Sequence, residues 1–228
     1  MHRIKEQMFQ FQHFKDLGEE GLSLGLGESI DRSFAQLNKD PWYQLVGAQR
    51  LRAMTKFSRV DGAWKRLEDQ SFYQSAGINR YNGGVQRTFN PIDETCVPEY
   101  FLFSLAQRQS RLFGIEEGDW QLNVHQIRIQ TTCGSEAEGL STPEGIHRDG
   151  HDFIAMMLWK RTNVRGAASQ LYDLDLNLLE ERTLEHRGEG VLLNDRQCMH
   201  AVTPFYPEDP SDAATRDVFI FDWNQRNA

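Results

Sequence analysis

The sequence predicts a mainly β protein with N-terminal helices, in which short strands form a sandwich or barrel. Three observations lead to this fold class. Apolar residues recur at helical spacing in the first part of the chain, and the second half consists of brief alternating or wholly apolar runs. Segments rich in Gly, Asp and Asn separate those runs. Many short strands with irregular loops are typical of sandwiches and barrels, and not of sheets built from alternating strands and helices.

Length and composition set the scale of the fold. The chain has 228 residues, of which 39% are hydrophobic, including 14 Phe and 5 Trp, so it can build a sizeable core. We expect a single domain over residues 1–228, with residues 1–50 as a helical N-terminal extension and residues 51–228 as a β core with supporting helices. The net charge of −8, without a block of like charges, argues against a nucleic-acid partner.

The helical expectations fall in two regions. Between Glu28 and Arg50, apolar residues at roughly helical spacing lie on both sides of the Asp40-Pro41 break, and they predict two short helices there. Glu99 to Phe113 is predicted to be an amphipathic helix.

The strand expectations follow in order. Thr55–Val60 and Val85–Phe89 are predicted strands on either side of an Asn82-Gly83-Gly84 turn. Alternation predicts a strand over Gln121–Thr131, with Gln126 and Arg128 on one face and His125 on the other. Four later strands are predicted: Phe153–Trp159, Ser169–Leu174, Gly190–Leu193 and Val218–Trp223.

His147, Arg148 and Asp149 form a His-x-Asp sequence, and His200 lies far downstream before Ala201. Residues two apart on an extended strand point to the same side, so one metal ion can bind both His147 and Asp149. The tripeptide alone is weak evidence, but it comes just before a buried apolar run, where barrel sites usually open. Two nitrogens and one carboxylate suit one face of an Fe(II) ion and leave the other face open for co-substrate and O₂.

Arg216 begins the last predicted strand, sixteen residues after His200. A guanidinium group at the base of a buried pocket can bind a carboxylate through two parallel hydrogen bonds, which lysine cannot imitate. Beside an iron site, the carboxylate that it suits is the far end of 2-oxoglutarate.

Several of these segments carry a family resemblance. The stretch Thr142 to Asp149, with His200 to Pro204 and Arg216-Asp217, resembles the 2-oxoglutarate/Fe(II)-dependent dioxygenases. Within them it is similar to the bacterial group that hydroxylates free L-amino acids, of which L-isoleucine dioxygenase is typical. Gly83 to Asn90 and His125 to Arg128 also match that group, and the resemblance covers roughly residues 50–224.

The resemblance implies a double-stranded β-helix, which is a cupin-like jelly roll, with N-terminal helices supporting its larger sheet. It implies Fe(II) bound by His147, Asp149 and His200, with 2-oxoglutarate held by Arg216 and O₂ as the oxidant. It also implies hydroxylation, or sulfoxidation of a thioether, on a small substrate such as a free aliphatic L-amino acid, with release of succinate and CO₂. The chain departs from its relatives at Gly166 to Gln170, where they carry a Gly-Gly-Asp-Asn-like turn, and this departure bears on the substrate.

Five residues are candidates for the substrate pocket. Gln126 and Arg128 either line a wet cavity or form a plain surface face. Arg87 either binds the substrate carboxylate or faces solvent from a loop. His151 is a candidate supporting residue or substitute ligand, and Trp159 a candidate for the pocket rim. For His125, a satisfied core histidine is the favoured interpretation.

Other functions remain open on the sequence alone. His147 and His151 have zinc-protease spacing, although Gly150 between them argues against it. Cys198, near His200, is either a zinc ligand or a small buried apolar residue, and the second is favoured. A catalytically silent cupin-like sensor of small acids and a purely structural metal site are further alternatives.

The sequence also supports expectations about location and assembly. Three widely spaced cysteines, a polar Met1 to Gln7 segment and the lack of a long apolar run predict a cytoplasmic protein without a membrane partner. A homodimer is left open.

Overall fold

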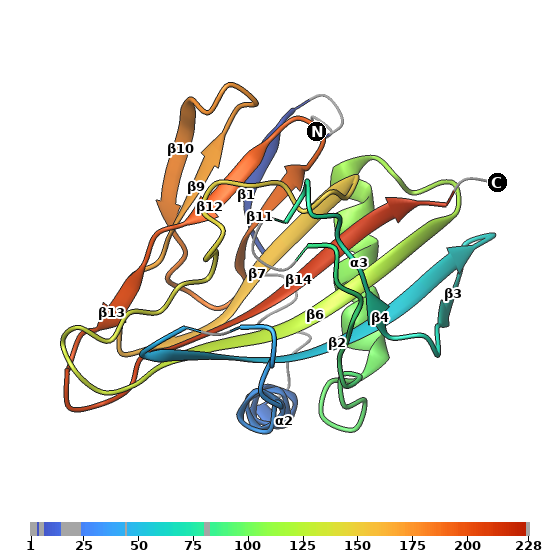
Figure 1. The fold of residues 1–228 in the computed structure, drawn as a ribbon. Coiled ribbons are helices and arrows are strands. Elements are labelled where there is room, and N and C mark those ends of the chain that lie inside the picture. The colour runs from blue at the N-terminus through green and yellow to red at the C-terminus, as the bar shows by residue number, and fades with distance from the viewer. Residues whose placement is uncertain (1–3, 5–6, 15–23, 44, 80–82, 227–228) are drawn as a thin grey trace.

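Seven antiparallel strands form one large twisted sheet across the molecule (Figure 1). The computed structural model describes residues 4, 7–14, 24–43, 45–79 and 83–226. In spatial order the strands of this sheet are β1 (Phe9–His13), β11 (Glu189–Asn194), β7 (Phe153–Thr162), β14 (Thr215–Gln225), β6 (Trp120–Thr131), β2 (Ala48–Val60) and β3 (Ala63–Arg66).

Smaller sheets complete the β structure. They are β10 (Leu178–Thr183) with β9 (Ala168–Tyr172) and β12 (Met199–Val202), β13 (Phe205–Pro207) with β8 (Val164–Gly166), and β4 (Ser71–Phe72) with β5 (Arg87–Thr88). Figure 1 shows β9, β10 and β12 beside the large sheet. Leu171 of β9 packs with Ile154 and Val191 of the large sheet, so the two sheets share a core. This is a jelly roll, and the predicted fold class is confirmed.

Two helices, α2 (Leu24–Ala35) and α3 (Glu99–Phe113), pack against one face of the large sheet. Alternate residues of β14, such as Phe219 and Trp223, point to this face and join the largest apolar cluster. Phe34 of α2 contacts Phe219 with ring centroids 5.1 Å apart. Because side chains of a strand alternate, the intervening residues of β14 face the other way, into the space between the sheets.

The N-terminal region differs from the expected helical extension. Residues 9–13 form β1, which pairs with β11 at the edge of the large sheet. The second short helix is absent from the described residues between Pro41 and Val46, where a turn and an isolated bridge occur instead. The backbone N–H of Trp42 donates to the Asp40 carboxylate, which favours a turn over a helix.

The other predicted elements mostly lie where expected. The helix over Glu99–Phe113 is confirmed, and each later predicted strand overlaps a strand of the structure. Thr55–Val60 is the end of a longer strand, and its hairpin partner is β3, while only Arg87–Thr88 of the Val85–Phe89 segment is extended. Asn82 of the expected turn and most of the Met1 to Gln7 segment lie outside the described residues.

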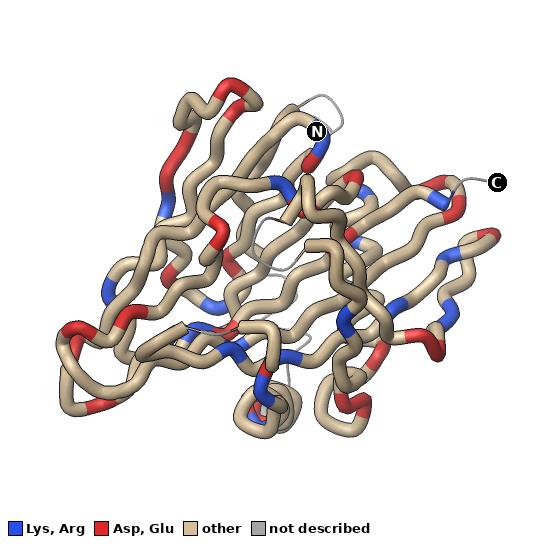
Figure 2. Tube along the Cα trace, in the orientation of Figure 1, with Lys and Arg blue, Asp and Glu red and all other residues tan. Residues whose placement is uncertain are grey.

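Two features of the structure concern binding to nucleic acid or to a membrane: the distribution of charged residues and the character of the helices. Figure 2 shows basic and acidic residues interspersed along the chain. Within the described residues, neither helix has the length and apolar character needed to cross a bilayer.

Close packing between β11 and β7 gives a stability prediction. A Cβ on Gly190 would lie 2.4 Å from the carbonyl oxygen of Met156, and backbone cannot move away cheaply. We therefore expect Gly190→Ala to lower the free energy of unfolding by about 2–3 kcal/mol in urea titrations. Gly25→Ala is the control, because its Cβ would meet nothing within 4 Å; it should leave stability unchanged or raise it by up to about 1 kcal/mol. Equal effects from the two variants would contradict the packing argument.

Candidate metal centre

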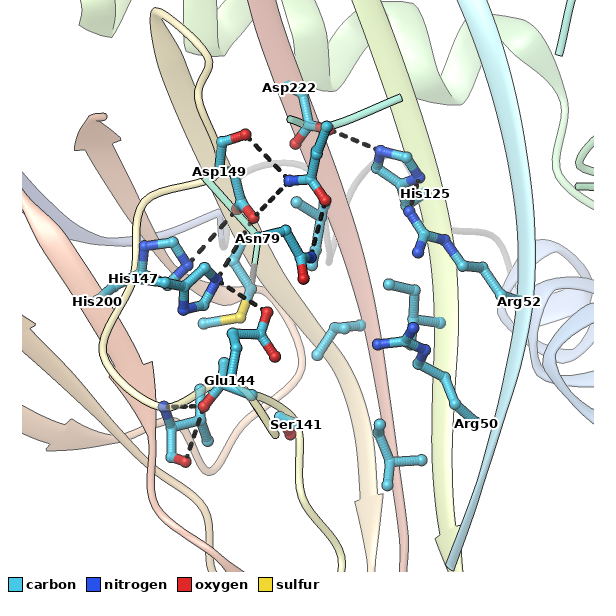
Figure 3. Close-up of a pocket in the computed structure, with 18 of the residues that line it drawn as sticks. Arg50, Arg52, Asn79, His125, Ser141, Glu144, His147, Asp149, His200 and Asp222 are labelled. Atoms are coloured by element: carbon cyan, nitrogen blue, oxygen red, sulfur yellow. Dashed lines mark hydrogen bonds and ion pairs between the residues drawn. The ribbon is translucent and has the colours of Figure 1, made fainter. Parts of the chain in front are cut away.

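Three side chains from two distant segments of the chain converge beside the inner face of the large sheet. His147 Nε2 lies 3.4 Å from Asp149 Oδ1, and His200 Nε2 lies 3.6 Å from Asp149 Oδ2. One ligand atom from each residue lies within 4.8 Å of the other two. Figure 3 shows the three side chains pointing toward one another. The group is therefore compact enough to bind one metal ion.

Backbone contacts hold the three residues together. His147 and His200 exchange two backbone hydrogen bonds, of 3.0 and 2.9 Å, which bring the first histidine beside β12. Asp149 follows in the loop before β7, and so the predicted extended His-x-Asp segment is only partly formed. The Asp195 carboxylate accepts hydrogen bonds from the backbone N–H groups of Asp149, Gly150 and His151, at 3.2, 2.7 and 2.9 Å. It thereby fixes the loop that carries the acidic ligand.

Without a metal ion, His147 and Asp149 form an ion pair, and a metal ion bound here would displace the proton on His147 Nε2. His147 Nδ1 donates to the carbonyl oxygen of Gly145 at 2.9 Å, which leaves Nε2 facing Asp149. Burial lowers the pKa of His147, but the Asp149 carboxylate outweighs it and raises that pKa to about 9. The same pairing holds the pKa of Asp149 well below its usual range, although burial opposes this. An anionic carboxylate with two imidazole nitrogens is a donor set that suits Fe(II).

The zinc alternatives do not fit this geometry. His151 Nε2 lies 3.2 Å from the Asp222 carboxylate, and the group of possible ligands forms without it. Cys198 is fully buried in an apolar cluster with Leu171 and Leu193. Burial raises the pKa of its thiol to about 11, which opposes the thiolate that zinc requires. The interpretation of Cys198 as a buried apolar residue is confirmed.

A cavity of about 100 Å³ opens beside the triad. Its floor is the inner face of the large sheet, where alternate residues of β14 and β6 point inward, including Arg216, Val218, Ile220, His125 and Ile127. Figure 3 shows Arg50 and Arg52 of β2 reaching toward this space from the side opposite to His147 and His200. The cavity thus has the triad on one wall, a floor on which apolar side chains surround Arg216 and His125, and a cationic wall.

Arg216 lies at the buried base of the cavity, with 2% of its surface exposed. Within the described part of the chain, its guanidinium donates hydrogen bonds to Ser141 Oγ, at 3.4 Å, and to the sulfur of Met156, at 3.8 Å. Among the described residues, no carboxylate forms an ion pair with it. Burial lowers the pKa of Arg216 to about 10, and Arg161 contributes to the shift, so the group is still a cation near neutral pH. A buried cation in this state is suited to an anionic ligand.

Three predicted pocket residues lie elsewhere. Gln126 and Arg128 face α2 and not the cavity, so their assignment to the pocket is wrong. Gln126 exchanges hydrogen bonds with Ser33 at 3.1 and 3.0 Å, and Arg128 forms two bonds to the Asp217 carboxylate at 2.7 and 2.6 Å. Trp159 is also on the helix side, where its indole N–H donates to the Asp31 carboxylate at 2.7 Å. Partners from distant segments satisfy all three side chains without a wet cavity.

Other polar residues do line the cavity. Arg87 is 1% exposed and lines the cavity, so the interpretation of it as a solvent-facing loop residue is wrong. His125 is buried and satisfied, as expected, yet it also lines the cavity between Arg52 and Asp222. Among the described residues, eight polar lining residues had not been assigned to the pocket from the sequence: Arg50, Arg52, Gln74, Asn79, Ser141, Thr142, Glu144 and Asp222. Of these, only Thr142 and Glu144 carried a sequence signal, because they lie within the motif that ends at Asp149.

Comparison with protein families decides the class. A family model described as 2OG-Fe dioxygenase matches residues 31–222. The chain belongs to the 2OG-Fe dioxygenase family. This family is one of oxygenases that use Fe(II), 2-oxoglutarate and O₂. The match covers all three residues of the triad and Arg216.

Solved structures agree with the fold of this dioxygenase. A bsmA homolog from Methylobium petroleophilum PM1 is 25% identical, with a TM-score of 0.78 over 97% of this chain and 90% of the other. IDO from Bacillus thuringiensis is 16% identical, with a TM-score of 0.79 over 98% of this chain and 93% of the other. The bifunctional enzyme flvA of Aspergillus flavus is 23% identical over 85% of this chain. This dioxygenase spans only 26% of the length of that curated relative.

Proposed function

We propose that this dioxygenase oxidises a free L-amino acid, with iron held by His147, Asp149 and His200 and 2-oxoglutarate anchored by Arg216. The observation that carries the proposal is the placement of the triad and Arg216 on the same small cavity. When bound, the iron supplies oxidation of a C–H bond or a thioether by O₂, coupled to conversion of 2-oxoglutarate to succinate and CO₂.

The protein residues have separate tasks in this proposal. The Nε2 atoms of both histidines and the Asp149 carboxylate provide three ligand atoms on one side, which leaves the cavity side open. Arg216 binds the distal carboxylate of 2-oxoglutarate, and Val218 and Ile220 on the same strand face contact its methylene groups. The apolar floor excludes water from the reacting atoms.

The charges that remain favour an amino acid. Glu144 lies in the cavity with its Oε1 atom 3.3 Å from His147 Nε2. Once that nitrogen binds iron, the carboxylate can pair with a substrate ammonium group. Arg87 is a cation on the same cavity and can pair with a substrate carboxylate, as one interpretation of the sequence holds. A molecule that carries both groups on a small carbon skeleton complements this arrangement.

Anaerobic titration tests the proposal. Adding Fe(II) and 2-oxoglutarate to the protein without oxygen should produce the weak visible charge-transfer band of the iron chelate. With oxygen, one or more of the common L-amino acids should raise succinate release at least about tenfold above the rate without substrate. A band without any stimulated turnover would favour the silent sensor. A colourless mixture would argue against the iron site itself.

A further inference from the structure

A continuous hydrogen-bonded chain connects the cationic wall of the cavity to the proposed iron ligand. Arg87 donates to Oε1 of Gln74 at 2.8 Å, and Asn79 donates to the same oxygen at 3.0 Å. The Gln74 side-chain N–H₂ group donates to the carbonyl oxygen and to Oδ1 of Asp149, at 3.0 and 3.2 Å. Because two donors already occupy the Gln74 oxygen, its amide nitrogen must face Asp149. Gln74 is 6% exposed, so water does not compete for these bonds.

The arginines at this wall retain unused donors. Arg52 and Arg87 are 7% and 1% exposed, and the Nε atom of each has no hydrogen-bond partner. Among the described residues, neither forms an ion pair with a carboxylate, whereas Arg50 is paired with Asp40 at 2.7 Å. The guanidinium carbons of Arg52 and Arg87 lie 5.2 and 4.9 Å from the centre of the Phe72 ring. Two buried cations without a counter-ion on one cavity are costly unless a ligand supplies the anion.

Neighbouring groups fix the positions of both cations. The guanidinium of Arg52 donates to Nδ1 of His125 at 2.9 Å, and His125 Nε2 donates to the Asp222 carboxylate at 2.7 Å. Phe72 and Arg87 are direct partners across the β4–β5 ladder, and the Arg87 guanidinium packs on the Phe72 ring in the cavity lining. Such fixed donors bind an anion without a further loss of side-chain entropy.

We propose that Arg52 and Arg87 form the binding site for the substrate's α-carboxylate, and that Gln74 couples this site to the iron ligand Asp149. The inference rests on the proposed function, since it locates the acid group of the amino acid. A carboxylate bound to Arg87 holds that guanidinium in place. The guanidinium then fixes the Gln74 amide, and the amide orients the oxygen atoms of Asp149. Gln74 is thus a positioning residue, and substrate binding and iron binding strengthen each other through it.

Paired substrates test the carboxylate site. Each common L-amino acid is assayed beside its α-carboxamide, which keeps the ammonium group and side chain but lacks the negative charge. For the most active amino acid, wild-type kcat/KM should exceed that of the amide by about thirtyfold, and Arg87→Gln and Arg52→Gln should each remove most of this preference. Arg226→Gln, at an exposed position, is the matched control and should keep it. An acid preference that survives in both cavity variants would overturn the site.

The coupling has its own measurement. Fe(II) affinity is determined anaerobically with 2-oxoglutarate, in the absence and presence of the most active amino acid. In Gln74→Glu, a second carboxylate faces that of Asp149. We expect Fe(II) affinity to fall by about 10–100-fold, and the increase in Fe(II) affinity that the amino acid produces to be lost. Gln49→Glu, a residue bonded to Gln130 and outside the cavity lining, should retain both. An unchanged gain in Gln74→Glu would overturn the coupling.

The two proposals can fail separately. If no amino acid or amide stimulates succinate release while the iron–2-oxoglutarate band forms, the amino-acid substrate is wrong. Acetate then serves as the probe of the arginine site. A shift of the band by acetate in wild type but not in Arg87→Gln would support a carboxylate site for another class of acid, whereas an equal response in the two proteins would overturn the site.

Discussion

Asp149→Ala is expected to abolish Fe(II) binding and to reduce amino-acid-dependent succinate formation by on the order of a thousandfold or more, equivalent to about 4 kcal/mol of transition-state stabilisation. Asp149 supplies the single anionic ligand of the triad, and both histidines face it at 3.4 and 3.6 Å. Without it, two neutral imidazoles remain, which hold a hard dication weakly. The anaerobic visible band should be absent at Fe(II) concentrations that saturate the wild-type protein.

A matched control separates loss of the ligand from loss of the fold. Asp175→Ala removes a carboxylate at an exposed position, and it should bind iron and turn over as the wild type does. The unfolding midpoint of Asp149→Ala should be insensitive to added Fe(II), whereas that of the wild type should rise with the metal concentration. Turnover of Asp149→Ala within tenfold of the wild type would show that iron is held elsewhere.

The convergence of His147, Asp149 and His200 could be expected from the sequence because these residues lie in short motifs. His147 and Asp149 are two residues apart, and His200 comes beside a buried strand, so pattern alone brought them together. The same holds for the helix over Glu99–Phe113, whose periodicity is local. The sequence also carries a local signal for β1, because Phe9, Gln10, Phe11 and Gln12 alternate as in a strand.

The inner face of β6 could not be predicted in this way. Alternation shows that Gln126 and His125 lie on opposite faces, but it does not show which face lines the cavity. In this fold neither face of the central strands is a plain outer surface. One face packs against α2 and α3, and the other lines the cavity. Gln126 and Arg128 find their partners 93 and 89 residues away, and such long-range pairing is invisible to periodicity. Arg52 and Gln74 are likewise brought to the cavity by long-range packing, which no local sequence pattern indicates.

Arg216→Lys and Arg216→Met are expected to raise the KM for 2-oxoglutarate by about a hundredfold or more, with a much smaller effect on the kcat of the lysine variant at saturating co-substrate. The guanidinium offers two parallel donors to a carboxylate, and an ammonium group cannot reproduce that geometry. Strand register places Arg216 opposite Ile129 of β6 and Arg161 of β7. Since β14 is a central strand and only 2% of Arg216 is exposed, water cannot replace the lost hydrogen bonds. Steady-state kinetics with varied 2-oxoglutarate measure the effect.

Replacing Arg216 is expected to have the opposite effect on the stability of the protein without ligand. Arg216 is a buried cation whose contacts are a hydroxyl group and a thioether, and burial holds its pKa near 10. Because the folded state binds this proton less tightly than the unfolded chain, the group destabilises the fold at neutral pH, and the penalty fades only above about pH 10.

Arg216→Met should therefore unfold at an equal or higher urea concentration than the wild type, yet gain nothing from 2-oxoglutarate. Wild type at a hundred times its Kd should gain about 2.7 kcal/mol. Arg226→Met should behave as wild type does in both measurements. A large loss of ligand-free stability in Arg216→Met would mean that the arginine serves the fold and not the co-substrate.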